Sequence, residues 1–303
     1  MTEKPFRLGV GQIAAMRADV RGNLDLIAQC VSQAEQHQVQ HLVFPELALT
    51  GYLVNNRFTE AARHLDSPEI QELKNLSRAV DLTVGFIEET PAALFYNSAL
   101  HLSRGRIVGL HRKIYPPTYG RFDERRYFGA GWDISAFDTP HARMAMLICA
   151  DAWHLPLPYM AAHDGADVLL ILAASSQQGL SETTPCHDAW RWMCQSYSLT
   201  LSCFVVLANM AAGDEEYSFW GGSFVAGPDG NLLTQSQTNG PDLVWADVDL
   251  QVLRRQRVQL PFRRDDSLVH TVQLGQKILR SKVRRDRFYG EEEPQDPVPV
   301  KPR

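Results

Sequence analysis

Apolar and polar residues alternate along this chain in short blocks, which predict strands and helices in turn. Short apolar runs bounded by polar or turn-forming residues are typical of buried strands. Apolar residues at helical spacing predict helices, and Asn23 is expected to cap the first of them. Expected strands lie at 8–13, 41–44, 82–87, 144–148, 168–172, 203–207, 223–226 and 244–248. Expected helices lie at 23–38, 68–79, 158–163 and 189–198. This alternation favours a mixed α/β layered domain.

Turn signals and composition predict the domain organisation. The pattern over 98–110 reads as a hairpin that turns at 104–106, and the turn 227–231 joins two further strand-like runs. No change in composition marks a boundary before about residue 260. We therefore expect one domain over 1–270 and an extension over 271–303, which is disordered or contacts a partner because it ends in a stretch rich in Glu and Pro.

The composition is that of an ordinary soluble globular protein and excludes several classes. Hydrophobic residues make up 45% of the 303 residues and charged residues 21%. A net charge of -5 gives no reason to expect nucleic acid as a partner, and the arginine-rich stretch 254–264 reads as a solvated or subunit-facing surface. The start of the chain lacks the apolar core of a secretory signal, and no run approaches the roughly 20 apolar residues that span a bilayer. We expect a cytoplasmic protein without membrane segments.

The cysteines predict neither a disulfide framework nor a metal site. There are five, an odd number, and too few for disulfides at this length. Cys186, Cys194 and Cys203 lack the spacing of zinc ligands, and no glycine-rich phosphate loop is present, so we expect no metal and no cofactor. Only Cys149 ends an apolar run at a turn rich in polar and aromatic residues.

Three reactive side chains each follow an apolar, strand-like run. Glu46 follows 41–44, Lys113 follows 107–112 and Cys149 follows 144–148. Taken singly, each has an ordinary alternative: a solvated loop glutamate, a lysine that reaches water, or a structural thiol. Together they supply a base, a cation and a thiol, from which a thiolate nucleophile can form.

The order and context of these residues resemble the nitrilase superfamily of carbon–nitrogen hydrolases. Segment 44–52 contains Pro-Glu-x-x-x-x-Gly-Tyr, and segment 122–128 is similar to the one that holds a second glutamate in that family, here Glu124. Asn209 and segment 219–223 extend the similarity, which covers nearly all of residues 6–262. The resemblance implies a four-layer α-β-β-α sandwich.

The resemblance also implies a role for each residue. Glu46 takes the proton of Cys149, whose thiolate attacks the carbon of an amide or nitrile. Lys113 and the backbone N–H of Ala150 stabilise the oxyanion, and Glu124 orients Lys113 and the substrate. Five aromatic residues near the motifs either wall a substrate pocket or fill the core: Tyr52, Tyr119, Trp153, Phe219 and Trp220.

Within the family, residues 113–128 are most similar to the glutaminase portion of glutamine-dependent NAD synthetases. The synthetase signature Ser-Gly-Gly-x-x-Ser is absent, so we expect a stand-alone amidase that acts on a small amide or N-carbamoyl compound. Cys149-Ala150-Asp151 differs from the Cys-Trp-Glu of true nitrilases, which argues against nitrile hydrolysis. Nitrile hydrolysis, acyl transfer to an amine and a catalytically silent binding protein remain alternatives, as does a Cys–His pair using His111, His154 or His187.

An apolar stretch after the nucleophile predicts self-association. Residues 153–160 are unusually apolar, and Trp190 and Trp192 fit the same surface. We expect a homo-oligomer, a dimer or a higher even-numbered state, with 278–289 contributing to the contact.

Overall fold

The computed structural model describes residues 4–52, 57–119, 123–177, 184–213 and 218–281. It divides into two units, Met1–Arg263 and Arg264–Arg303. In the described part of the first unit, strands form two six-stranded sheets, in the orders β12-β1-β2-β3-β4-β5 and β11-β10-β9-β8-β7-β6. The first sheet contains β1 (Phe6–Gln12), β2 (His41–Val43), β3 (Asp81–Glu89), β4 (Phe95–Ser103), β5 (Arg106–Arg112) and β12 (Asp242–Val248). The second contains β6 (Phe137–Asp138), β7 (Arg143–Ile148), β8 (Val168–Ala173), β9 (Phe204–Asn209), β10 (Phe224–Ala226) and β11 (Leu232–Gln235).

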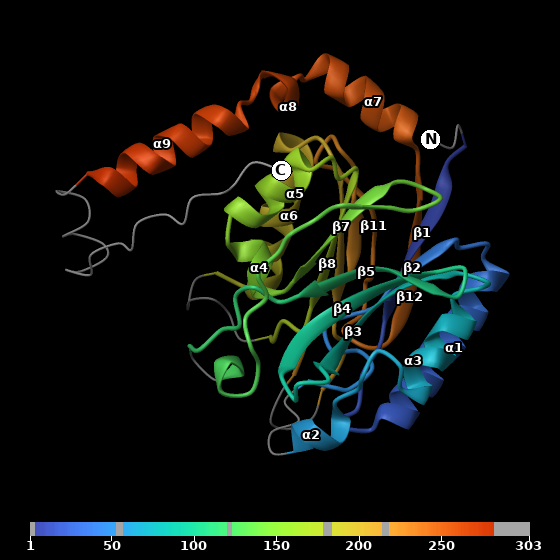
Figure 1. Cartoon of the computed structure of the whole chain (residues 1–303). Helices are drawn as coiled ribbons and strands as arrows, with labels where there is room; N and C mark the ends of the chain where they lie inside the picture. The colour runs from blue at the N-terminus through green and yellow to red at the C-terminus, as the bar shows by residue number, and fades with distance from the viewer. Residues whose placement is uncertain (1–3, 53–56, 120–122, 178–183, 214–217, 282–303) are drawn as a thin grey trace. The chain divides into compact units, whose positions relative to one another are not determined.

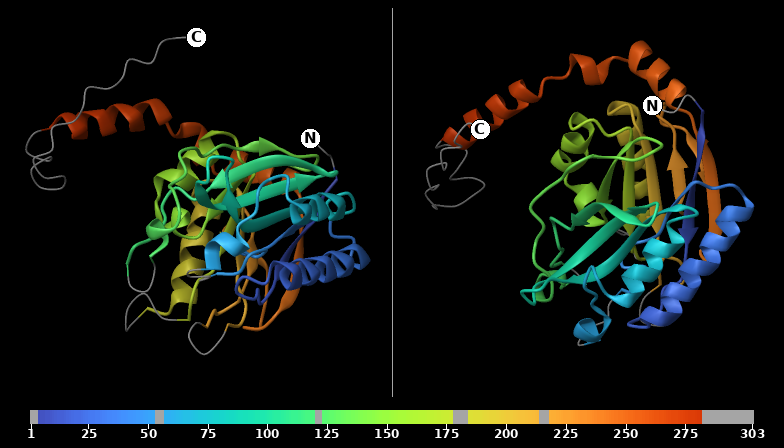
Figure 2. Two further views of the ribbon diagram at one scale, coloured as in Figure 1. Left: turned by 60° about the horizontal axis from the view of Figure 1, so that its bottom comes forward. Right: turned by 45° about the vertical axis from the view of Figure 1, so that its right-hand side comes forward.

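Helices cover the outer face of each sheet, while the inner faces pack on each other (Figure 1). Both views in Figure 2 show the same arrangement. The first sheet is covered by α1 (Val20–Gln36) and α3 (Pro68–Leu76), and the second by α4 (Ala150–Trp153), α5 (Pro156–His163) and α6 (Cys186–Thr200). Shorter or later helices of this unit are α2 (Phe58–Ala61), η2 (Glu124–Arg126), α7 (Leu250–Gln259) and the start of α8 (Phe262–Asp265).

The alternation of side chains along β7 shows why these layers form. Met144 and Met146 lie in the apolar layer between the sheets, whereas Ala145 and Leu147 face the helices. Successive side chains of a strand point to opposite faces, so a continuous apolar run predicts a strand that is buried on both sides. The four-layer α-β-β-α sandwich expected from the sequence is confirmed.

The start of the first long helix was predicted incorrectly. Helix α1 begins at Val20, and its N-cap is Asp19, whose carboxylate accepts a hydrogen bond from the Gly22 N–H at 3.0 Å. Asn23 lies inside the first turn, where its amide binds the backbone of Met16 and the carbonyl of Leu49. Asn23 therefore anchors the loops around the helix start, a contact that local sequence does not reveal.

The second unit contains the rest of α8 and helix α9 (Leu268–Arg280), which spans the boundary expected at residue 270. The Ser267 side chain caps α9 by accepting from the His270 N–H. No residue of α9 is buried, and large apolar side chains such as Val269 and Leu279 are exposed. Residues beyond 281, including most of 278–289, lie outside the described part. Within that part, no helix combines the length and apolarity needed to cross a bilayer.

A pair of histidines is buried between the sheets on β2 and β4. The Thr83 hydroxyl joins them, lying 2.8 Å from His41 Nε2 and 3.0 Å from His101 Nδ1. The remaining ring nitrogens, His41 Nδ1 and His101 Nε2, have no hydrogen-bond partner among the described residues. Burial lowers the pKa of His101 to about 3 and that of His41 well below its usual value. Both rings are therefore neutral in the folded protein near neutral pH.

We expect acid to destabilise the fold through this pair. The unfolded chain takes up protons below the ordinary histidine pKa of about 6.5, whereas the folded chain does not until about pH 3. Stability should fall as pH drops through this window, with about 2 kcal/mol of the loss at pH 5 coming from His101. Urea unfolding at pH 5 and 7 measures this; His101→Asn should remove that share of the difference, whereas His270→Asn on exposed α9 should remove none. An equal pH dependence in His101→Asn and the wild type would contradict the assignment.

Candidate active site

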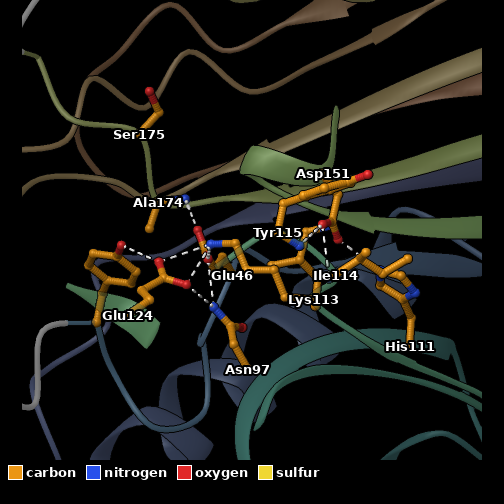
Figure 3. A network of polar contacts seen from close by, with 12 residues as sticks. Glu46, Asn97, His111, Lys113, Ile114, Tyr115, Glu124, Asp151, Ala174 and Ser175 are labelled. Atoms are coloured by element: carbon orange, nitrogen blue, oxygen red, sulfur yellow. Dashed lines mark hydrogen bonds and ion pairs between the residues drawn. The ribbon is translucent and has the colours of Figure 1, made fainter. Parts of the chain in front are cut away.

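Strand ends from both sheets bring polar side chains together. Glu46 follows shortly after β2, whereas Lys113 and Cys149 directly follow β5 and β7. Ala174, directly after β8 of the second sheet, donates its N–H to Glu46 Oε2 at 2.9 Å. Figure 3 shows Ala174 above the carboxylate of Glu46, with Lys113 beside it. The site is thus closed by contacts between the two sheets.

A tight turn packed against a glycine fixes Glu46. Leu47 adopts a φ of 52°, and the turn is closed by a hydrogen bond from the Ala48 N–H to the Pro45 carbonyl at 3.3 Å. The turn lies directly on Gly85 of β3, where an added Cβ would stand 2.4 Å from the Leu47 nitrogen. Only glycine permits this approach. Glu46 is fully buried as a result, unlike the solvated loop glutamate of the alternative interpretation.

Lys113 forms the centre of a buried ionic network. Its Nζ lies 2.6 Å from Glu46 Oε1 and 2.9 Å from Glu124, and Figure 3 shows both carboxylates meeting at the ammonium. Burial alone would lower the pKa of Lys113, but Glu124 and Glu46 outweigh it and hold that pKa well above its usual value. Lys113 is therefore a permanent cation, not a lysine that reaches water.

Glu124 is held by more than the lysine. The hydroxyl of Tyr52 donates to Glu124 Oε1 at 2.6 Å, and the Asn97 amide lies 3.4 Å from Oε2. Burial raises the pKa of the Glu124 carboxyl, with Lys113 opposing and Glu46 adding to the effect. Burial also raises the pKa of Tyr52, so its hydroxyl stays a donor. Glu124 thus stands beside Lys113, and its role as an orienting carboxylate stays a prediction.

Cys149 occupies a strained turn between β7 and α4. Its φ of 47° and ψ of −102° belong to a region that side chains other than glycine rarely adopt. Cys149 is half-buried as a residue, and burial of its thiol raises the pKa well above the usual value, with Glu46 adding to the effect and Lys113 opposing it. The resting thiol is therefore neutral, and it would need a base that removes its proton in order to act as a nucleophile.

Asp151 ties the nucleophile turn to the segment that carries Lys113, a contact that the sequence analysis missed. Its Oδ1 accepts from the backbone N–H groups of Ile114 and Tyr115, at 3.0 and 2.9 Å. Its Oδ2 accepts from the Ile148 N–H at 3.2 Å and lies 2.9 Å from His111 Nε2. Figure 3 shows Asp151 reaching toward this segment. The carboxylate therefore fixes Lys113 and Cys149 relative to each other.

The three histidines considered for a Cys–His pair lie beside other side chains. His111 pairs with Asp151, the ring of His154 stacks on Tyr115 at 3.5 Å, and His187 is exposed beside Asp188. These partners are carboxylates or an aromatic ring, not cysteine thiols. Among the described residues, no group of three or more His, Cys, Asp or Glu side chains could hold a metal.

The five aromatic residues that the sequence suggested for a substrate pocket lie in different parts of the structure. Phe219 packs edge-on against Tyr52, with ring centroids 6.1 Å apart, next to the carboxylates. Trp153 instead packs against Trp190 of α6, on the helix side of the second sheet. Trp220 is buried and lines a cavity of about 420 Å³. Tyr119 is 64% exposed. These residues occupy different surroundings, and a shared role in substrate binding stays a prediction.

The chain matches a known protein family and several characterised relatives. The model of the carbon-nitrogen hydrolase family matches residues 7–258. Glutamine-dependent NAD(+) synthetase from Thermotoga maritima is 29% identical over 293 residues, which are 92% of this chain and 48% of that protein. The chain thus spans about half the length of this relative. Omega-amidase NIT2-B from Xenopus laevis is 27% identical and is covered along 94% of its length by 86% of this chain.

Solved structures share the fold. The carbon-nitrogen hydrolase from Helicobacter pylori G27 superposes with a TM-score of 0.77 at 23% identity. The match covers 89% of this chain and 98% of that one. The two sheets and their helix layers are therefore those of this known fold.

Proposed function

Because this chain belongs to the carbon–nitrogen hydrolase family, we propose that it hydrolyses a small amide or N-carbamoyl compound through a thioester on Cys149. The observation that carries this proposal is the buried contact of Glu46 with Lys113 at 2.6 Å, next to a strained thiol turn. A buried carboxylate held by a permanent cation is suited to exchange protons with a neutral thiol.

In the proposed acylation step, Glu46 takes the proton of Cys149 and the sulfur bonds to the substrate carbonyl carbon. The electron pair of the C=O bond moves to the oxygen, and the ammonium of Lys113 and the N–H of Ala150 stabilise the resulting oxyanion. Glu46 then gives its proton to the substrate nitrogen as the C–N bond breaks. Ammonia or an amine leaves, and the acyl group remains on sulfur as a thioester.

In the proposed deacylation step, water gives a proton to Glu46 and its oxygen bonds to the thioester carbon. The C–S bond breaks when this second tetrahedral intermediate collapses, and sulfur recovers the proton from Glu46. Glu124 keeps its contacts with Lys113 and Tyr52 throughout and orients the cation rather than exchanging protons. The products are a carboxylic acid, or a carbamic acid from a carbamoyl compound, and ammonia or an amine.

An activity screen tests this proposal. Primary amides, N-carbamoyl compounds and nitriles are each incubated with the protein, and ammonia release and product mass are measured. The Cys149→Ala protein, purified in parallel, controls for contaminating hydrolases. Turnover of amides but not nitriles supports the proposal; nitrile turnover, acyl transfer to an added amine, or no turnover on any substrate supports one of the alternatives.

We also propose that the protein forms at least a dimer through the surface after Cys149. Leu155 is 67% exposed and Trp192 is 59% exposed, which is unusual for large apolar side chains on an isolated surface. The sequence analysis placed Trp190 on this surface, and that prediction is wrong. Trp190 of α6 is 2% exposed and packs in the core. Cytoplasmic location stays a prediction from the sequence.

Light scattering behind a sizing column is expected to give at least twice the 34.1 kDa monomer mass. Leu155→Glu and Trp192→Glu should each reduce both mass and activity, because they place charge in the contact. Leu94→Glu, at an exposed side chain between β3 and β4 of the first sheet, should change neither. A fully active species at the monomer mass would contradict the proposal.

A further inference from the structure

Asn97 contacts both carboxylates of the site through its side chain and the backbone of Lys113 through its own, although no sequence motif singled it out. Its Nδ2 lies 2.8 Å from Glu46 Oε1 and 3.4 Å from Glu124 Oε2, and its backbone carbonyl accepts from the Lys113 N–H at 2.8 Å. Figure 3 shows the amide below the two carboxylates. An amide NH₂ group carries two hydrogens, so Asn97 can donate to both carboxylates at once.

Strand pairing places Asn97 here. Ser98 of β4 pairs with Arg112 of β5, so Asn97 stands directly opposite Lys113. Side chains opposite each other on an antiparallel pair point to the same face. The next pair points to the other face, where Ser98 and Arg112 both bind the carboxylate of Glu88, at 2.7 and 2.6 Å. Asn97 and Lys113 thus hold carboxylates on the face of the candidate active site. Ser98 and Arg112 hold the carboxylate of Glu88 on the opposite face.

The orientation of the Asn97 amide satisfies the two carboxylates but leaves its own oxygen without a hydrogen bond from the described residues. Its Oδ1 is buried and has no hydrogen-bond partner among the described residues. A buried acceptor without a partner is unfavourable, and a purely structural asparagine would gain by turning its oxygen to a donor. The carboxylates prevent this, because they accept hydrogen bonds only from the NH₂ side.

The contacts of Glu46 leave one position for a proton. Oε1 accepts from both Lys113 and Asn97, which use the two lone pairs of that oxygen. Among the described residues, Oε2 accepts one hydrogen bond, from the N–H of Ala174, which also interacts with the Cys149 thiol. The free acceptor position of Glu46 therefore lies on the oxygen that shares the Ala174 N–H with that thiol.

We propose that Asn97 is a positioning residue that saturates Glu46 Oε1, steadies Glu124, and thereby directs the thiol proton to Glu46 Oε2. This deepens the proposed function and rests on its assignment of Glu46 as the base. Asn97 cannot accept or release a proton, so its donor is unchanged throughout the cycle. Its N–H donors match the lone pairs of a carboxylate, which is the form of Glu46 that accepts the proton of Cys149. The titratable groups around Glu46 are Lys113, Glu124, Tyr52 and Cys149.

The rate at which iodoacetamide alkylates Cys149 reports this proton transfer without any substrate. Intact-mass spectrometry and peptide mapping measure that rate from pH 5 to 9 in the wild type, Asn97→Leu, Asn97→Ala and Ser98→Ala. Removing a donor from a buried carboxylate should move the acid limb of the profile about one pH unit higher. The plateau rate should also fall, by up to about 100-fold, because the base is no longer fixed.

Ser98→Ala is the matched control, because it removes a donor from Glu88 on the opposite face of the same strand. Its alkylation profile should overlay that of the wild type even if its melting temperature falls. An unmoved acid limb in folded Asn97 variants, an equal shift in Ser98→Ala, or failure of both Asn97 variants to fold would each overturn the proposal. Absence of amide turnover would overturn the proposed function but leave this measurement intact.

Discussion

Replacement of Lys113 by Met is expected to lower turnover by about 1,000-fold and to destabilise the protein. Loss of one donor at an oxyanion site costs about 100- to 1,000-fold in rate. Here the same change also leaves the buried carboxylates of Glu46 and Glu124 without their shared cation. Breaking a buried ion pair from one side costs about 3–5 kcal/mol, and the carboxylates avoid part of this by taking up protons. A protonated Glu46 can no longer act as the base.

Steady-state kinetics and urea unfolding measure the two effects. Arg112→Met is the matched control, because Arg112 precedes Lys113 on the chain and pairs with Glu88 outside the site. It should lower stability but leave kcat within about twofold. If Lys113→Met kept more than about a tenth of wild-type activity, Lys113 would have no part in stabilising the oxyanion.

The strands and the reactive residues were predictable because their signals are local. An apolar run followed by a turn residue identifies the end of a buried strand, and Glu46, Lys113 and Cys149 each follow such a run. Their order and context resembled the nitrilase superfamily, and the family match over residues 7–258 confirms that resemblance, whereas the role of each residue stays a prediction.

The contacts of Asn97 were not predictable, although the hairpin that carries it was. Counted from the turn at Arg104 and Gly105, regular pairing would place Lys113 opposite Tyr96. A bulge between His101 and Leu102 shifts the register by one, so that Lys113 stands opposite Asn97. A shift of one residue moves a side chain to the other face of the sheet. Gly109 lies beside this bulge, but a glycine within a strand suggests a bulge without fixing the register that results.

The arginine-rich stretch shows a second limit of local reading. It was interpreted as a solvated or subunit-facing surface, and Arg254 and Arg255 of helix α7 are indeed exposed, but Arg257 of the same helix binds Asp167 at 2.8 Å. The same guanidinium donates to the carbonyl of Ser202 at 3.1 Å. The partners lie far away in the sequence, so only the folded chain shows that this arginine fastens α7 to the starts of β8 and β9.

Replacement of Cys149 by Ala is expected to abolish all turnover while leaving the fold intact. The change removes the nucleophile and adds no bulk. Wild-type protein treated mildly with iodoacetamide should carry one fast adduct, at Cys149, because Cys186, Cys194 and Cys203 are buried. Cys30 is partly exposed, but burial raises the pKa of its thiol to about 11, and it lacks the proposed base, Glu46, that would take the proton of Cys149. Labelling of Cys186 or Cys194 ahead of Cys149 would count against the assignment.

Replacement of Cys149 by Gly distinguishes the loss of the thiol from the relief of backbone strain. Alanine keeps the Cβ that is strained at a φ of 47°, whereas glycine adopts this conformation freely. Cys149→Gly should therefore be as inactive as Cys149→Ala yet more stable, by about 1 kcal/mol after the entropy that glycine loses on folding. Denaturant unfolding of the two variants measures the difference. If the glycine variant proved equal or less stable, the turn at residue 149 would store no backbone strain.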